Sequence, residues 1–160
     1  MSYSVYQDIT SQIPPQRLMK ALVSERHKVV PKLRPNIFKS MELLHGDGGT
    51  GSIRKAEFVD GFPMKYMIHR IDVLDMKNLY CKFTLYEGCV LGDKYEEIEH
   101  EIQLEPLGEG CKGKISTHYH PKPGVVVNKE EIDAIKAKAH TVIQDVEKYL
   151  LANPDVCAVV

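Results

Sequence analysis

Apolar and polar residues alternate along much of the first 120 positions of the chain, with the two-residue period of a strand that has one buried face. The pattern is clearest at 79–86 (LYCKFTLY) and at 97–104 (EIEHEIQL). Segments rich in Gly and Pro separate the alternating stretches and are typical of turns. The pattern predicts one strand at 3–11 and about six more, at 36–44, 53–60, 64–74, 79–86, 97–104 and 114–120.

Three other segments follow a helical period. Two short helices are predicted at 15–24 and 24–30, between the first strand and the second. A long amphipathic helix is predicted from Asn128, a favourable N-cap followed by Glu131 as in a capping box, to about residue 153. Its apolar stripe consists of Ile132, Ile135, Ala139, Val142, Val146 and Leu150.

The order of these elements predicts an α+β fold. Consecutive strands joined by short turns imply an antiparallel sheet, and one helix with a single apolar stripe must cover one face of that sheet. A strongly curved sheet with one long helix against it leaves interior space, which is the usual geometry of a small-molecule cavity. We therefore predict a single ligand-binding domain over 1–160.

The composition argues against several classes of function. The chain has 21 Lys and Arg against 22 Asp and Glu, so a nucleic-acid partner, which favours a basic face, is not expected. No segment reaches the ~20 apolar residues of a membrane-spanning helix, and the N-terminus lacks the basic and apolar regions of a secretory signal. We expect no membrane partner.

The cysteines favour a cytoplasmic location. Cys81, Cys89, Cys111 and Cys157 contain no C-x-x-C pair, and a domain of 160 residues does not need disulfides for stability. We interpret the four as free thiols in a reducing compartment, and two disulfide bonds remain the alternative.

Four motifs spread over the whole chain match one known family. They are IPPQRLMKA at 13–21, GDGGTGSI at 46–53, the pair YEG and GD at 86–88 and 92–93, and VEKYLLANP at 146–154. In combination they resemble the plant pathogenesis-related class-ten family, which includes the major birch-pollen allergen. Within that family the chain is most similar to members proposed to handle plant phenolics.

The resemblance implies a seven-stranded antiparallel sheet wrapped around the long C-terminal helix, a V of two short helices, and an internal hydrophobic cavity. Members of the family are cytosolic and induced by stress or pathogens, and they bind cytokinins, flavonoids and other amphipathic molecules. The resemblance thus implies a binding or carrier protein without a cofactor, as a monomer or weak dimer. The candidate ligand-binding residues are Arg26, Val30, Ile37, Phe58, Tyr66, His69, Phe83, Leu85, His100, Ala139, Val142 and Ile143.

Two histidines of that set have a direct argument from strand parity. His69 shares parity with the apolar Met67, and His100 shares parity with Ile98, so both are predicted to face inward. An inward histidine is either a satisfied core residue or a polar group that orients a ligand, and the sequence favours neither. Tyr66 has the opposite parity to His69 and faces inward only if a bulge intervenes.

No metal site is predicted. His118 and His120 alternate onto one strand face, which two metal ligands could use, but no third ligand accompanies them at a convincing spacing. We interpret them as surface histidines.

The glycine-rich segment Gly46, Gly48, Gly49 and Gly51 is interpreted as a tight turn. Ser52 follows the last glycine where a phosphate-binding loop requires Lys, and the segment joins two strands where such a loop joins a strand to a helix. A turn that uses the conformational freedom of glycine is favoured over a nucleotide site.

An enzyme is the alternative function. Glu96, Glu147 and Tyr149 match residues proposed for ribonuclease activity in the family, but they are far apart in sequence, and a charged surface is the favoured interpretation. The cavity set of the family's synthases, with its catalytic Lys, has no match here. A phenolic-coupling catalyst and a protein with a filled interior stay open beside the carrier.

Overall fold

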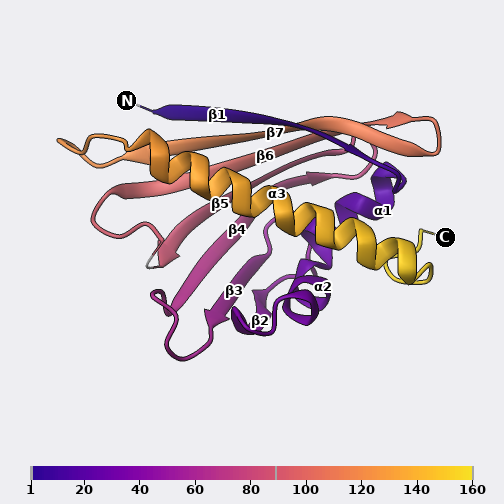
Figure 1. The fold of residues 1–160 in the computed structure, drawn as a ribbon, viewed down its shortest axis with the longest axis horizontal. Coiled ribbons are helices and arrows are strands. Elements are labelled where there is room, and N and C mark those ends of the chain that lie inside the picture. Colours follow the sequence, from indigo (N-terminus) through magenta and orange to yellow (C-terminus); the bar gives the residue numbers. More distant parts are fainter. Residues whose placement is uncertain (1, 89, 160) are drawn as a thin grey trace.

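The computed structural model describes residues 2–88 and 90–159 (Figure 1). In chain order the elements are β1 (Tyr3–Ser11), α1 (Pro15–Met19), the π-helix η1 (Lys20–Ser24), α2 (Arg26–Leu33), β2 (Phe38–His45), β3 (Ile53–Phe58), β4 (Tyr66–Asp75), β5 (Tyr80–Gly88), β6 (Tyr95–Leu107), β7 (Gly110–Pro121) and α3 (Lys129–Ala152).

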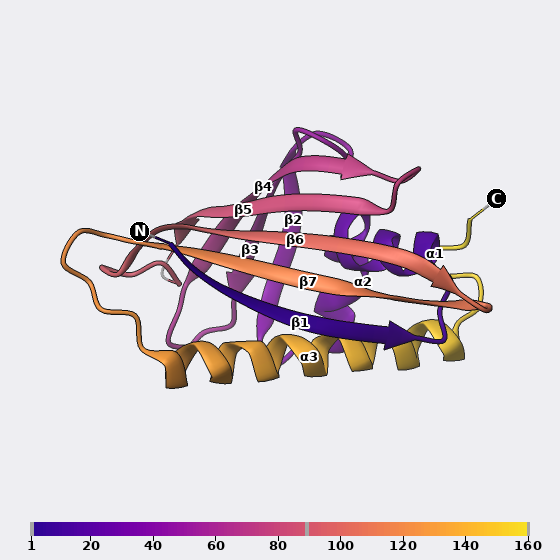
Figure 2. The same cartoon turned by 90° about the horizontal axis from the view of Figure 1, so that it is seen from above.

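The strands form one curved antiparallel sheet in the order β1-β7-β6-β5-β4-β3-β2. Only the first strand departs from a simple meander, because β1 pairs with β7 and closes the far edge. Helix α3 lies along the concave face, and α1 and α2 lie toward its C-terminal half (Figures 1 and 2). The predicted fold is confirmed, with a seven-stranded sheet in the described residues.

The start of α3 is capped as predicted. The Asn128 side chain accepts hydrogen bonds from the backbone N–H groups of Glu130 and Glu131. The second half of the capping box is not formed, because the Glu131 carboxylate pairs with Lys94, with 2.9 Å between the Nζ and Oε2 atoms. This ion pair ties the start of α3 to the segment between β5 and β6.

The C-terminal end of α3 is held by Arg17, a half-buried residue of α1. Arg17 on α1 donates from Nε to the carbonyl oxygen of Val156 at 2.8 Å, and from Nη2 to those of Leu150 and Asn153 at 2.7 Å each. The last carbonyl groups of a helix have no partner within it, and a cation there also complements the helix dipole. Arg17 therefore fixes where α3 ends against α1.

Several predicted boundaries were wrong, and two of them have a clear structural cause. Helix α2 was expected to stop at Val30, but it continues through Pro31 to Leu33. Pro31 has no backbone N–H to donate, yet the next turn is still closed, because the Arg34 N–H donates to the Val30 carbonyl oxygen at 3.0 Å. The last strand was expected to begin at residue 114, but β7 already begins at Gly110. A Cβ at Gly110 would lie 2.1 Å from the Ser11 carbonyl oxygen, so this glycine permits close strand approach.

The core consists of two apolar clusters. The larger joins α1, η1, the inner strands and the C-terminal half of α3, and it includes Leu18, Leu22, Val146 and Leu150. The smaller lies around Leu85, Ile98, Tyr119 and Ile132. The interior between these clusters is incompletely filled.

Three cysteines, Cys81, Cys111 and Cys157, are buried free thiols, as predicted. Cys89 lies outside the described residues. Burial raises the pKa of the Cys81 thiol to about 12. None of the helices in the described ranges is long and apolar enough to cross a membrane.

Candidate functional site

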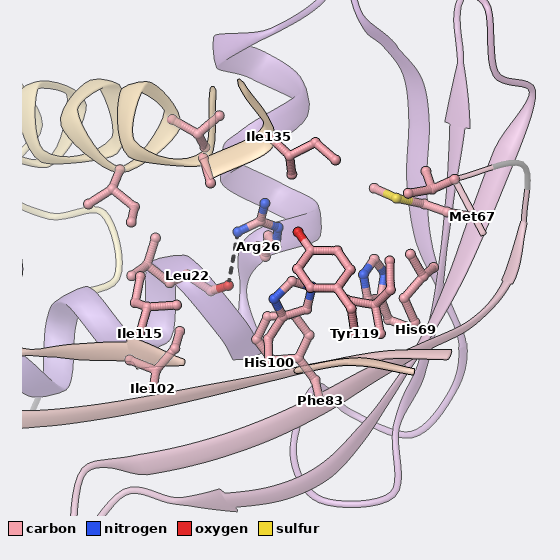
Figure 3. Close-up of a pocket in the computed structure, with 16 residues that line it drawn as sticks. Leu22, Arg26, Met67, His69, Phe83, His100, Ile102, Ile115, Tyr119 and Ile135 are labelled. Atoms are coloured by element: carbon pink, nitrogen blue, oxygen red, sulfur yellow. Dashed lines mark hydrogen bonds between the residues drawn. The ribbon is translucent and has the colours of Figure 1, made fainter. Parts of the chain in front are cut away.

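A cavity of about 230 Å³ lies between the concave face of the sheet and α3 (Figure 3). Strands β4 to β7 form its floor, α3 forms its roof, and η1 and α2 close one side through Leu22 and Arg26. Its lining consists of Leu22, Arg26, Met67, His69, Phe83, Leu85, Val90, Ile98, His100, Ile102, Ile115, Tyr119, Ile135, Ala139, Val142 and Ile143.

Strand alternation places the floor residues. His69 and His100 both line the cavity, as their parity predicts, together with Phe83 and Leu85 of β5. The roof comes from the apolar stripe of α3, of which Ile135 is 45% exposed. The cavity is therefore bordered along α3 by residues that are partly exposed to solvent.

Three rings form a row across the floor. Phe83 stacks on His100, with 4.9 Å between the centroids, and meets His69 edge-on at 5.7 Å. The row follows from the register, because Phe83 of β5 lies directly opposite His100 of β6. The row therefore places two imidazole rings, one on each side of Phe83, on the otherwise apolar floor of the cavity.

Both histidines are neutral at pH 7. Burial lowers the pKa of His69 well below its usual value, and the positive charge of Arg54 lowers it further. Burial likewise lowers the pKa of His100 to about 4, with a further contribution from Arg26. The His100 Nδ1 atom lies 3.1 Å from Thr117 Oγ1, whereas the His69 ring has no hydrogen bond to any residue of 2–88 or 90–159.

Two arginines lie close to this row, and sequence reasoning selected only one of them. Arg26 lines the cavity, and its Nη1 donates to the Leu22 carbonyl oxygen at a long 3.4 Å (Figure 3). Arg54 is 2% exposed and donates from Nη1 to the Val23 carbonyl oxygen at 2.6 Å. Burial lowers the pKa of both guanidinium groups, that of Arg54 to about 9, with repulsion from Arg26 contributing.

Tyr66 does not line the cavity. Its hydroxyl donates to Glu87 Oε2 at 2.8 Å, and Lys55 Nζ lies 5.1 Å from the centre of its ring. A register irregularity does occur beside His69, but the extra residue is Tyr86 on β5, so the parity of β4 is unchanged. Tyr66 therefore keeps the outward orientation that strand parity alone predicts, and its assignment to the cavity is wrong.

Three other candidates also lie outside the cavity lining. Val30 lies one helical turn after Arg26 on α2, and it is fully buried in the larger core cluster. Phe58 stacks between Phe38 and Phe62, with centroid distances of 5.3 and 5.0 Å. Ile37 is half-buried, and its carbonyl oxygen accepts from Val59 N–H. None of these three side chains is therefore part of the cavity lining.

Several lining residues were missed by sequence reasoning, although a signal existed for some. Met67, Ile98 and Ile102 share the parity of the two histidines. Tyr119 stands between His118 and His120, so the same alternation that turns those histidines outward turns Tyr119 into the cavity. Burial raises the pKa of Tyr119 to about 12, so its hydroxyl stays protonated.

The glycine-rich segment uses its amides internally. Gly48 N–H donates to Ser52 Oγ, Gly49 N–H donates to Asp47 Oδ1, and Gly51 N–H donates to the Ile71 carbonyl oxygen at 2.7 Å. These donors are not available to a phosphate. The arrangement supports the turn interpretation.

The outward histidines meet glutamates of β6. His120 Nε2 lies 2.8 Å from Glu99 Oε1, and Glu97, Glu99 and His120 each place a possible ligand atom within 4.8 Å of the others. The two glutamates are on β6 and His120 is on β7, so the spacing of residues along the sequence does not reveal that they are neighbours. Glu99 already pairs with Lys82 at 3.1 Å.

The residues matched to ribonuclease activity are not brought together. Glu96 lies near Pro121 at one end of β7, whereas the charge of Glu147 acts on Cys111 at the other end. The two ends of a strand of this length are about 30 Å apart. A shared general acid–base site between these glutamates is therefore excluded by the geometry.

The chain belongs to the pathogenesis-related protein Bet v 1 family, whose model matches residues 1–153. It is 39% identical to the major allergen Mal d 1 of Malus domestica over 96% of both chains. It is 43% identical to the pathogenesis-related protein STH-2 of Solanum tuberosum over 94% of this chain and 95% of that protein. The resemblance found in the sequence motifs is thereby confirmed.

Solved structures share the fold. The crystal structure of Ara h 8.0201 is 28% identical and superposes with a TM-score of 0.84, covering 96% of this chain and all of that one. Norcoclaurine synthase from Thalictrum flavum, at 24% identity and a TM-score of 0.76 over 94% and 87% of the two chains, shares the fold alone.

Proposed function

We propose that the protein binds a small amphipathic organic molecule in the cavity between the sheet and α3. The apolar body of the ligand packs on Phe83, Leu85 and the α3 stripe, and its polar group is oriented by His69 and Arg26. The observation that supports this most directly is the lining itself, which is apolar apart from a few convergent polar side chains.

Burial of the ligand's apolar surface drives binding, at roughly 25 cal/mol per Å² removed from water. This term has no direction, so related ligands with the same apolar body are expected to bind. Cytokinins, flavonoids and other plant phenolics have the required combination of a flat apolar body and few polar groups. A volume of about 230 Å³ favours the smaller of these molecules.

The wider role proposed is that of a carrier in the plant cytoplasm, as a monomer or weak dimer, linked to defence or stress. Its support is the family and the naming of one relative as a pathogenesis-related protein. The enzyme alternative gains no comparable support, because the cavity lining of the described residues contains neither a carboxylate nor a lysine.

The experiment is titration with the neutral dye N-phenyl-1-naphthylamine, with native mass spectrometry to establish the stoichiometry. Ala139→Trp places a large ring at the cavity roof, and Ala137→Trp makes the same change on the same helix outside the lining. We expect saturable one-to-one binding that Ala139→Trp weakens at least about tenfold and Ala137→Trp leaves intact. Absence of saturable binding, or equal loss in both variants, would contradict the proposal.

A further inference from the structure

Arg26 is a cation without an anionic partner. No ion pair within residues 2–88 and 90–159 includes it, and its one side-chain hydrogen bond there is the 3.4 Å contact with the Leu22 carbonyl oxygen. A guanidinium group carries five N–H donors in a rigid planar fork. Most of its donors therefore lack a protein acceptor in the described structure.

The surroundings of Arg26 do not compensate its charge. The sixteen lining residues include no carboxylate. The nearest acidic residue in sequence, Glu25, is already paired with Lys20 and Lys28 at 3.3 and 3.7 Å. Arg54, which is buried, adds a second positive charge near Arg26 and His69. Arg26 is half-buried, and a partly desolvated charge that lacks a partner is costly, so an anion that pairs with it is expected to bind favourably.

The other polar groups of the cavity suit an anion as well. His69 and His100 are neutral, so they add no counter-charge, and each neutral ring keeps one N–H donor. Tyr119 retains its hydroxyl proton and lines the same cavity. In the view of Figure 3 the hydroxyl end of Tyr119 points to the side on which Arg26 lies.

We infer that the cavity selects amphipathic carboxylates, with the ligand carboxylate paired to the Arg26 guanidinium and its apolar body laid over the His69–Phe83–His100 row. The planar fork of arginine matches a carboxylate through two parallel hydrogen bonds, a geometry that a hydroxyl cannot reproduce. This inference rests on the proposed function and names the chemical class of its ligand.

The test compares 2-naphthylacetate with 2-naphthylacetamide, which has the same apolar body and no charge, by displacement of the neutral dye at pH 7.5. The wild type is expected to bind the acid about tenfold more tightly than the amide, the effect of one charge-assisted pair. Arg26→Gln is expected to remove that preference, because the acid loses more affinity than the amide does. Arg26→Lys retains part of it, because the charge stays and the fork is lost.

Arg70→Gln is the matched control, since Arg70 is an exposed arginine paired with Asp72 on the outer face. It is expected to bind both probes as the wild type does. Equal affinity of the wild type for acid and amide, or a preference that survives in Arg26→Gln, overturns the inference while the proposed function stands. Failure of the acid, the amide and the dye alike to bind overturns both. If Arg26→Gln does not fold, the wild-type ratio and Arg26→Lys decide the question.

Discussion

His69 and His100 lie 6.4 Å apart, measured between ring centroids, on strands that are not neighbours. Phe83 of the intervening β5 contacts both rings. Two polar groups are thus held on the floor of an apolar cavity: His100 has a hydrogen-bond partner, and His69 has none among the residues that the structure describes. This difference separates their expected roles, since His100 is partly satisfied by Thr117 and His69 has donor and acceptor capacity left for a ligand.

Replacement of His69 by alanine is expected to weaken polar ligands more than apolar ones. With 2-naphthol and naphthalene as probes, His69→Ala should cost the naphthol about threefold to tenfold, the value of one hydrogen bond, and naphthalene at most about twofold. Competition with the neutral dye measures both affinities. His69→Gln, which keeps a donor and an acceptor, is the control and should restore part of the difference. Equal losses for the two probes would remove the proposed role of His69.

His100 should make folding sensitive to acid. Its pKa is about 4 in the folded chain against an ordinary value of 6.5, so below pH 6.5 the unfolded chain takes up the proton more readily. The stability that depends on neutral His100 is therefore complete above pH 6.5 and falls as the pH drops toward 4. His69 acts in the same direction.

Urea unfolding at pH 7.5 and at pH 5 measures this effect. Between these values the wild type should lose up to about 2 kcal/mol more free energy of unfolding than His100→Gln does. His45→Gln is the control, because His45 is exposed at the end of β2, and it should follow the wild type. Identical pH dependence of the wild type and His100→Gln would show that the ring is not held neutral by burial.

Gly48 should tolerate no side chain. Its φ is +104°, and a Cβ would lie 2.3 Å from the Ser24 carbonyl oxygen, where the loop packs on the end of η1. Gly48→Ala is expected to cost more than about 2 kcal/mol of free energy of unfolding. In Gly49→Ala the nearest atom is a side-chain oxygen of Asp47 at 3.2 Å, so the cost should stay within about 1 kcal/mol. Chemical denaturation of both variants decides this, and equal costs would contradict the packing role of Gly48.

Local periodicity predicted much of this fold correctly. The alternation in β5 and β6 and the apolar stripe of α3 can each be recognised from a few consecutive residues, because one face of the element is buried and the other is solvated. The same parity placed His69 and His100 on the concave face. The start of β7 at Gly110 was less predictable, because the Ser11 backbone that approaches this glycine comes from the other end of the chain.

The sequence by itself therefore determined the strands, the long helix, the inward faces of His69 and His100, and the family, but it did not predict the π-helix η1. Only the tertiary structure decided which inward residues meet at one cavity. It placed Val30 in the larger core cluster, Phe58 in a stack of three phenylalanines and Tyr66 on the outer face. Within the described residues it also left Arg26 without a carboxylate partner. The physical reason is that parity depends on neighbouring residues, whereas a cavity and an unpaired charge depend on every element that packs around them.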